Sequence, residues 1–196
     1  MKFPFLLPLL VLLMWQGTVV RAEHADRLKP MQVEADRMQH DDPKQLTVLI
    51  GHVQAVKGTL VMRAAHMQVQ QDAHGQQLAQ LQAEVGGRVF FRQKREGLDE
   101  YIEGEAEQAV YDSLQDLMTL TGQAEIRILR QGQIADQIQG QRIVYNNSTE
   151  VMQVDGRVQG GGRARALLTP RAEASSDNKP LPSLQASPQL PLQGRP

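Results

Sequence analysis

Ala35-Asp36-Arg37-Met38-Gln39-His40 is the first copy of a block that recurs four times along this chain and decides its fold. In each copy a small residue is followed three positions later by an apolar residue, and two positions further on by a ring or a valine. The other copies are Ala64-Ala65-His66-Met67-Gln68-Val69, Ala106-Glu107-Gln108-Ala109-Val110-Tyr111 and Gly140-Gln141-Arg142-Ile143-Val144-Tyr145. Units that recur in this way predict a fold made of stacked copies of one supersecondary element.

A glycine follows each block, and around three of these glycines apolar residues alternate with a period of two, which is typical of a strand. In three of the four copies the glycine lies 16 positions after the first residue of the block, and the second copy has an insertion. The glycines are Gly51, Gly87, Gly122 and Gly156. Glycine in a strand permits a bulge or a bend, so we expect strands that fold over together into a double sheet.

Aligning the copies on this glycine predicts which side chains face the interior. The first predicted interior set is Leu49, Leu120 and Val154, and the second is Val53, Ala124 and Val158. Glycine-containing turn sequences at hairpin spacing lie at 56–59, 72–75, 96–99 and 130–133. Residues 76–85 fit both a helix and a strand, and we assign them to strand and loop. The prediction is an all-β antiparallel fold of repeated strand-turn-strand units.

Both ends of the chain differ from this body. Residues 1–22 combine a positive start, an apolar run from Phe3 to Trp15 and small residues before a cleavage position, as in a signal peptide. A retained membrane anchor is the alternative, but the apolar run is short for a bilayer. We assign 23–165 to one β domain and 166–196, which is rich in proline, to a disordered tail. A tether or a cap on the last strand edge is an alternative role for that tail.

Charge and cysteine content limit the class of protein. Cleavage after residue 22 would remove Lys2 and Arg21, so that 21 Lys and Arg become 19 against 22 Asp and Glu, and the net charge of −1 becomes −3. A mildly acidic chain is a poor candidate for binding nucleic acid, which requires neutralised phosphates. Cysteine is absent, so packing and hydrogen bonds must hold an exported chain together.

No arrangement of residues predicts an enzyme, a cofactor or a metal site. The five histidines lack the spacing of a zinc site, and no nucleophile elbow, phosphate-binding loop or dinucleotide fingerprint is present. Glu103, Glu105 and Glu107 alternate along one strand, which indicates a solvent-facing row. A glycosidase pair among them is an alternative that lacks a partner motif.

The predicted interior is rich in methionine and poor in rings, since aromatic residues make up 4% of the chain. Methionine adapts to irregular surroundings. The interior is therefore either an ordinary core or a sheath around something flexible and apolar, such as acyl chains. The interior methionines are Met31, Met38, Met62, Met67, Met118 and Met152.

Several stretches between about residues 30 and 158 resemble the OstA-like family of lipopolysaccharide (LPS) export proteins. The clearest are Ile102-Glu103-Gly104-Glu105-Ala106 through Tyr111 and Leu120-Thr121-Gly122-Gln123-Ala124. Others lie at 31–36, 51–53, 58–60 and 138–145. No single motif is sharp, but the order and spacing of these stretches together are specific.

The resemblance implies a slightly open, twisted antiparallel β-jellyroll in the periplasm. Such a protein would shield the lipid A acyl chains of LPS and carry it from the inner to the outer membrane, without enzymatic activity. It would stack head to tail with its own copies, with an LptC-like inner-membrane partner at one end and an LptD-like outer-membrane partner at the other. The edge segments would be 31–33 and 150–157.

Position within the matched blocks indicates a lipid path, although each residue could instead pack in an ordinary core. The expected lipid-binding residues are Met31, Val33, Met38, Leu49, Phe90, Tyr111 and Leu120. Which of Phe90 and Phe91 faces inward depends on a bulge that the sequence leaves open. A structural or adhesive β-repeat filament with a dry core is the alternative function.

Overall fold

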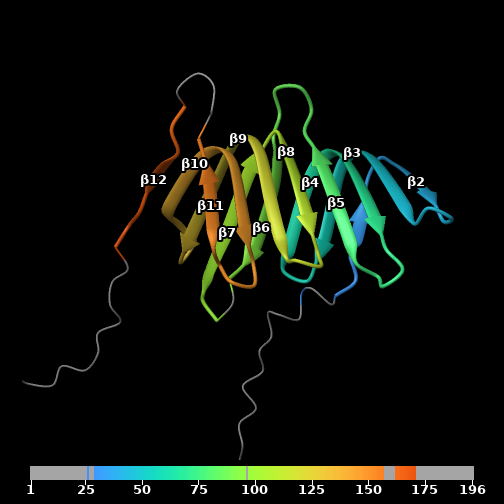
Figure 1. Cartoon of the computed structure of the whole chain (residues 1–196), viewed down its shortest axis with the longest axis horizontal. Coiled ribbons are helices and arrows are strands. Elements are labelled where there is room, and N and C mark those ends of the chain that lie inside the picture. Colours follow the sequence, from blue (N-terminus) through green and yellow to red (C-terminus); the bar gives the residue numbers. More distant parts are fainter. Residues whose placement is uncertain (1–25, 27–28, 96, 157–161, 171–196) are drawn as a thin grey trace, which may run out of the picture.

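The computed structural model describes residues 26, 29–95, 97–156 and 162–170, and its described residues form one 12-stranded antiparallel sheet that folds over on itself (Figure 1). The strands are β1 (Gln32–Glu34), β2 (Arg37–Asp41), β3 (Leu46–Lys57), β4 (Leu60–Gln71), β5 (Gln77–Gln82), β6 (Val89–Lys94), β7 (Glu100–Ala106), β8 (Gln108–Asp112), β9 (Leu117–Arg130), β10 (Gln133–Asn146), β11 (Met152–Asp155) and β12 (Arg165–Leu167). The predicted all-β jellyroll is confirmed, and 77–82 is a strand.

Four long strands, β3, β4, β9 and β10, bend in the middle and divide the fold into two facing layers. The layer that we call sheet I runs β2, β3, β4, β5, β8, β9, β10, β11. The layer that we call sheet II runs β1, β3, β4, β6, β7, β9, β10, β12. Each long strand gives one half to each layer, so the two sheets face each other along their full length.

The bends in β3 and β9 depend on glycine. Gly51 and Gly122 have φ of +80° and +82°, a region that side chains disfavour. A Cβ atom at Gly51 would collide with the carboxylate of Asp36, and one at Gly122 with that of Glu107. The β3–β4 register shifts between Ile50 and Val53. The predicted bend is confirmed at these two glycines, whereas Gly87 lies in the loop between β5 and β6 and Gly156 follows the end of β11.

The repeated sequence blocks mark where the chain passes from sheet II to sheet I. These passages lie at 35–36 between β1 and β2, within 64–66 of β4, at Glu107 between β7 and β8, and within 140–142 of β10. Each of the first three blocks therefore opens a unit that adds two strand segments to each sheet, and the fourth adds two to sheet I and, in the described residues, β12 to sheet II. The prediction of stacked units is confirmed, and we call the side of the molecule that carries these passages the crossing side.

The apolar core lies between the two sheets. Leu49, Leu120, Val53 and Ala124 are at most 1% exposed, as their alignment predicted. Val154 is partly buried against the core, and Val158 lies outside the described residues. Most of the remaining core consists of alternate residues on the strands of both sheets. Its largest members include Tyr111, Phe91, Leu60, Met62, Met67, Ile102, Met118, Ile126 and Ile143.

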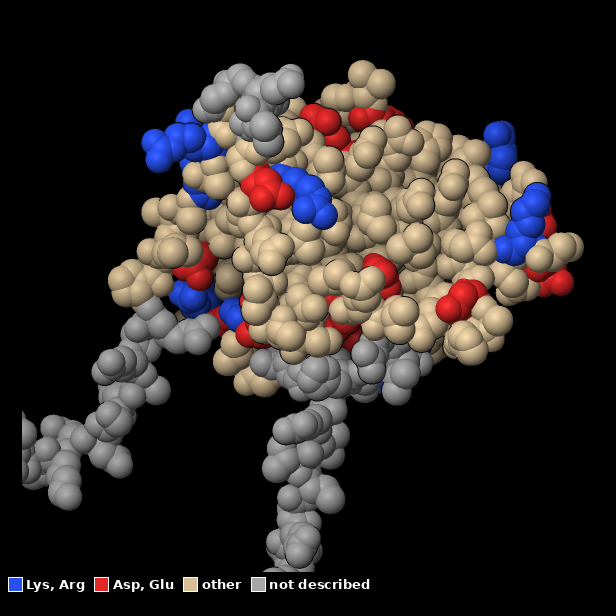
Figure 2. Space-filling view, in the orientation of Figure 1, with Lys and Arg blue, Asp and Glu red and all other residues tan. Residues whose placement is uncertain are grey.

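The outer faces of the two sheets differ in how many charged side chains they carry. On sheet II, Arg127 contacts Glu103, Glu105 and Glu125, and Arg92 contacts Glu103 at 2.8 Å. The face with β5, β8, β9 and β11 in front shows few charged side chains in Figure 2. Its outward positions include His66, Gln68, Gln80, Gln82, Gln108 and Val110. The two faces thus present different chemistry to solvent.

Strand β12 carries the folded part past residue 165, where we expected the disordered tail to begin. Ala166 pairs with Ile138, and the Thr169 backbone N–H donates to the Asp136 carboxylate at 2.8 Å. Sheet pairing thus continues beyond the predicted boundary. The predicted signal peptide, and the tail from residue 171, lie outside the described residues. None of the helical structure within the described ranges is long and apolar enough to cross a bilayer.

Candidate functional site

The interior between the sheets has an apolar part and a polar part. The apolar part lies along the middle of the strands. On one side of the molecule the turns of both sheets face each other, and we call this side the seam. The inward side chains at the seam are polar. These seam side chains are Lys57, Gln71, Gln77, Gln93, Arg95 and Glu100. The cross-section of the interior is therefore amphipathic.

A cavity of about 180 Å³ opens into the interior at the end of the molecule formed by β1 and β2. Its apolar walls come from both sheets, with Met31 and Val33 on one side and Val69 on the other. Its polar walls are His40, Gln45, Thr47, Gln71 and Gln77. Two of the predicted lipid-binding residues, Met31 and Val33, are thus brought together in an accessible space.

Met38 lies at the same end but is half exposed, with 50% of its surface accessible. The expectation that Met38 is enclosed in the interior is therefore corrected. Its Cα partner in the ladder is Leu49, which is fully buried. Paired residues of an antiparallel ladder point to the same face, so Met38 points inward, at a position where the double sheet ends. An apolar side chain is thus presented at the opening of the interior.

The middle of the interior is closed by protein side chains. Leu49, Tyr111 and Leu120 are 0%, 2% and 1% exposed. A Cβ atom at Gly104 would collide with the Phe91 ring and lie 2.9 Å from Leu120 Cδ1. Phe91 thus packs directly on the backbone of β7, and a guest molecule reaches these residues only if the sheets part or the side chains move.

The choice between the two adjacent rings is settled in favour of Phe91. Phe91 is 1% exposed and pairs with the buried Met62. Phe90 lies on the outer face of sheet II, where the Arg63 guanidinium sits 5.2 Å from its ring centroid. The expectation that Phe90 lines the interior is therefore wrong. The inward alternation that begins at Val89 continues through Phe91 without a bulge.

Polar contacts join the two sheets across the seam. Near β1, the Lys57 Nζ of sheet II donates to Gln77 Oε1 of sheet I at 3.1 Å. Near the other end, the Arg95 guanidinium contacts Glu150 of the β10–β11 turn at 2.5 Å. Arg95 also contacts Glu100, at 2.5 Å. The seam is thus held at two places by hydrogen bonds and ion pairs rather than by apolar packing.

Tyr145 lies beside Arg95 in the interior, and burial raises the pKa of its hydroxyl to about 12. Glu150 adds to this rise, while Arg95 opposes it. Because the neutral form is favoured in the folded state, the stabilisation is complete below the ordinary pKa of 10.0. It is lost as the pH rises from 10 towards 12.

Tyr145→Phe is therefore expected to reduce the loss of stability between pH 10 and 12. A shift of this size corresponds to about 2–3 kcal/mol. Urea unfolding of both proteins at pH 9, 10, 11 and 12 measures the difference. Parallel pH profiles for the two proteins would show that Tyr145 ionises equally in the folded and unfolded chains.

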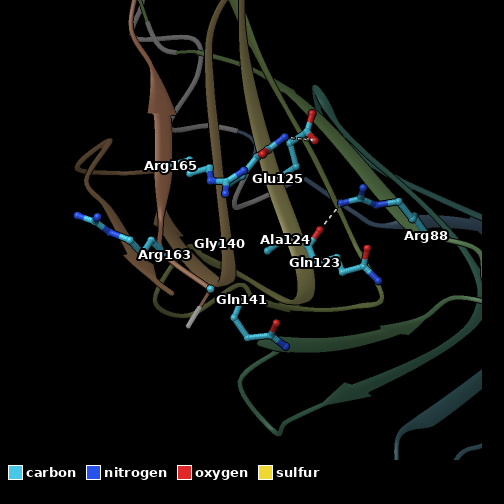
Figure 3. A pocket seen from close by; sticks show the side chains of 10 residues that line it. Arg88, Gln123, Ala124, Glu125, Gly140, Gln141, Arg163 and Arg165 are labelled. Carbon is cyan, nitrogen blue, oxygen red and sulfur yellow. Dashed lines mark hydrogen bonds between the residues drawn. The ribbon is translucent and has the colours of Figure 1, made fainter. Parts of the chain in front are cut away.

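Hollows on the crossing side of the molecule are polar and lie outside the apolar core. One, of about 310 Å³, is lined by Arg88, Gln123, Glu125 and other polar residues, with Arg88 donating to the Gln123 carbonyl (Figure 3). In the same view Arg163 points away from the hollow. Such a surface suits water and polar groups.

The row of glutamates predicted to face solvent does lie on the outer face, and each of its three carboxylates is paired. Glu103 contacts Arg92, and Glu105 contacts Arg127 at 2.7 Å. Glu107 accepts a hydrogen bond from Gln123 at 3.0 Å. Each carboxylate thus has a structural partner, and the row lacks the geometry of a paired acid and base across a cleft.

The double sheet with its amphipathic interior defines an open β-jellyroll. Residues 32–151 match the family model described as LptA/(LptD N-terminal domain) LPS transport protein. Because the match covers more than half of the chain, the chain belongs to this family of LPS transport proteins. The family is one of transport proteins, in agreement with the expectation that the chain is not an enzyme.

A solved structure shares the fold. It is LptH of Pseudomonas aeruginosa, described as the LptA-homologous periplasmic component of the lipopolysaccharide transport device. The two share 19% sequence identity with a TM-score of 0.64, and the alignment covers 74% of this chain and 99% of LptH. No curated protein sequence matches the chain.

Phe91 and Lys57 are interior residues that the sequence pattern did not identify. The sequence does not decide between Phe90 and Phe91, although the alternation from Val89 favours Phe91. Lys57 falls within a turn sequence, 56–59, and was assigned to the turn rather than to the end of a buried strand. Lys57 is only 4% exposed, because the segment before β1 and sheet I both contact it. Neither contact can be inferred from the sequence pattern.

Proposed function

We propose that this protein is a periplasmic LPS-binding bridge that shields lipid A acyl chains on their way from the inner to the outer membrane. The observation that carries the proposal is the amphipathic interior, which opens beside Met31, Val33 and Met38. Each methylene exposed to water costs about 0.8 kcal/mol, so a lipid with several chains needs an apolar shelter. The polar seam offers the sugar part a place next to solvent.

The lipid path begins at the open end and continues through the core. Met31, Val33 and Met38 make the first contacts, because they are accessible. Leu49, Tyr111 and Leu120 follow when the sheets part along the seam, and Phe91 takes the place that we had expected for Phe90. The seam suits such an opening, because polar contacts there exchange with water at low net cost.

The ends of the jellyroll supply the contacts of a bridge. At one end β1 and β2 are the outermost strands of the two sheets, and at the other end β11 and β12 are. Outer strands carry unpaired backbone groups, which favour strand addition. Because the two ends differ, we propose head-to-tail stacking of copies. An LptC-like inner-membrane protein would add at β1 and β2, and an LptD-like outer-membrane protein at β11 and β12.

The periplasmic assignment rests on the predicted signal peptide at 1–22 and on the fold shared with LptH, which is described as periplasmic. We propose that cleavage after Ala22 releases the mature chain. The domain at 23–165 would then include the segment before β1, extended at its other end by β12. The remainder of the tail up to residue 196 is proposed to stay disordered.

Photo-crosslinking in cells tests the proposed function. A crosslinking amino acid at Tyr111 or Leu120 is expected to capture LPS, because both side chains face the space between the sheets. The matched control is Gln108, which lies outward on β8, the same strand as Tyr111. Capture from Gln108 with none from Tyr111 or Leu120 would contradict the proposal.

A filament with a dry core is the second candidate, and the closed middle of the interior favours it. Purified protein that polymerises without saturable binding of lipid A would support this alternative. Saturable binding that blocks access to Met31 from solution would exclude it.

A further inference from the structure

The most unusual charged group inside this molecule is the ammonium of Lys57. The residue ends β3 on the inward face of sheet II and is only 4% exposed. Its Nζ donates to the Lys29 backbone carbonyl at 2.7 Å and to the Gln77 side-chain carbonyl at 3.1 Å. In the described part of the chain Lys57 has no ion pair, so a buried cation is held by neutral acceptors alone.

Burying an ammonium without an ion pair costs free energy of folding, which is unfavourable for a residue with a structural role alone. Burial lowers the pKa of Lys57, because desolvation outweighs the attraction of the more distant Asp116 and Asp26 carboxylates. Asp116 itself accepts hydrogen bonds from Asn147 and Ser148, at 3.1 Å and 2.9 Å. Asp26 accepts two from Thr59. Both carboxylates are thus engaged elsewhere, and the ammonium retains unused attraction for an anion.

The position of Lys57 links this cation to the cavity at the open end. Gln77, which accepts its hydrogen bond, also lines that cavity. Gln32 pairs with Val56, so the preceding residue Met31 lies opposite Lys57 in the antiparallel ladder. An apolar wall and a buried cation therefore lie side by side where the seam meets the cavity.

We infer that Lys57 is an anion-recognition site at the mouth of the interior, and that it binds the phosphate-bearing headgroup of an acylated lipid. This inference rests on the proposed function and deepens it. The acyl part occupies the cavity beside Met31, Val33 and Val69. A phosphate oxygen replaces one of the two neutral acceptors of the ammonium. The hydrogen bond then joins two opposite charges, which makes it stronger than the bond from the ammonium to a neutral carbonyl that it replaces.

The test compares Lys57→Met with the full-length mature protein. The probes are lipid A with its phosphates, lipid A from which the phosphates have been removed, and inorganic phosphate alone. We expect the variant to bind phosphorylated lipid A about tenfold more weakly or worse. Binding of the phosphate-free lipid should be unchanged, and inorganic phosphate alone should compete only weakly because it lacks the acyl contacts.

Arg37→Met is the matched control, since it removes one positive charge from an exposed position on β2 at the same end of the molecule. It should bind both lipids like the unmodified protein. Thermal unfolding accompanies the binding measurements. Lys57→Met should be as stable as the unmodified protein or more so, because an apolar group replaces a buried ion. A loss of affinity therefore cannot arise from unfolding.

A measurement on the unmodified protein makes the test independent of the variant. The ¹⁵N resonance of the Lys57 ammonium should shift when phosphorylated lipid A is added, and the pKa of the group should rise beside the phosphate. Equal binding of phosphorylated and phosphate-free lipid by both proteins would overturn the inference, as would an equal loss of both in Lys57→Met. If the unmodified protein binds no lipid at all, the proposed function itself fails.

Discussion

Phe91→Ala is expected to lower the free energy of unfolding by about 3–5 kcal/mol, the range for truncating a buried aromatic side chain. Phe91 is 1% exposed, and its ring packs on the bare backbone of Gly104, which the Leu120 side chain also approaches. Two sheets form the walls around the ring, and strands paired on both sides cannot move in to fill the space. The full cost of the cavity should therefore be felt.

Phe90→Ala is the matched control, because it removes the same ring from the next residue of the same strand. Phe90 lies on the outer face, where it contacts the Arg63 guanidinium, and an exposed contact of this kind contributes about 0.5–1 kcal/mol. Urea unfolding followed by circular dichroism measures both variants. A larger loss for Phe90→Ala would reverse the assignment of the two faces of β6.

Glu100→Ala is expected to destabilise the protein by about 2–3 kcal/mol, somewhat less than the loss of a fully buried ion-pair partner. The Glu100 carboxylate lies between two guanidiniums, with Arg95 at 2.5 Å and Arg130 at 3.0 Å. The Arg95 side chain is 12% exposed, so water replaces the lost partner poorly. The Arg130 side chain is 24% exposed, which moderates the effect.

Glu100→Ala should also loosen the seam close to Arg95. Arg95 joins sheet II to Glu150 of sheet I, so loosening Arg95 frees the β10–β11 turn. Hydrogen exchange in residues 147–151 is therefore expected to speed up in Glu100→Ala. The control is Asp155→Ala, which breaks the exposed pair with Arg142 at 3.5 Å and should cost less than about 0.5 kcal/mol. Similar losses in the two variants would mean that the Glu100 network is no stronger than a surface ion pair.

The architecture was predictable because it repeats. The alignment of three of the four units identified the buried faces at Leu49, Leu120, Val53 and Ala124, and it placed bends at Gly51 and Gly122. Agreement among copies compensates for the weakness of any one strand pattern. Features that depend on a single copy were harder to predict, and Phe90 was placed on the wrong face for this reason.

The polar side of the interior was beyond the reach of the sequence pattern. Lys57, Arg95 and Glu100 lie at strand ends, where a polar residue ordinarily faces solvent. They become interior residues because the turns of two sheets meet across the seam, which depends on how the bent strands fold over. Strand β12 was missed for a similar reason. Its residues are exposed, and its position depends on pairing with β10 and on the bond from Thr169 to Asp136.

The stacked units also make this molecule extendable. Each of the first three units contributes two strand segments to each sheet. Neighbouring strands lie about 4.8 Å apart, so one such unit accounts for roughly 10 Å of length. A unit inserted between the second and third units would lengthen the interior between the two sheets by that amount. The terminal strands would stay as they are, because only interior neighbours change. The number of repeats in such a chain thus sets the length of one subunit. This length is independent of the residues in the terminal strands.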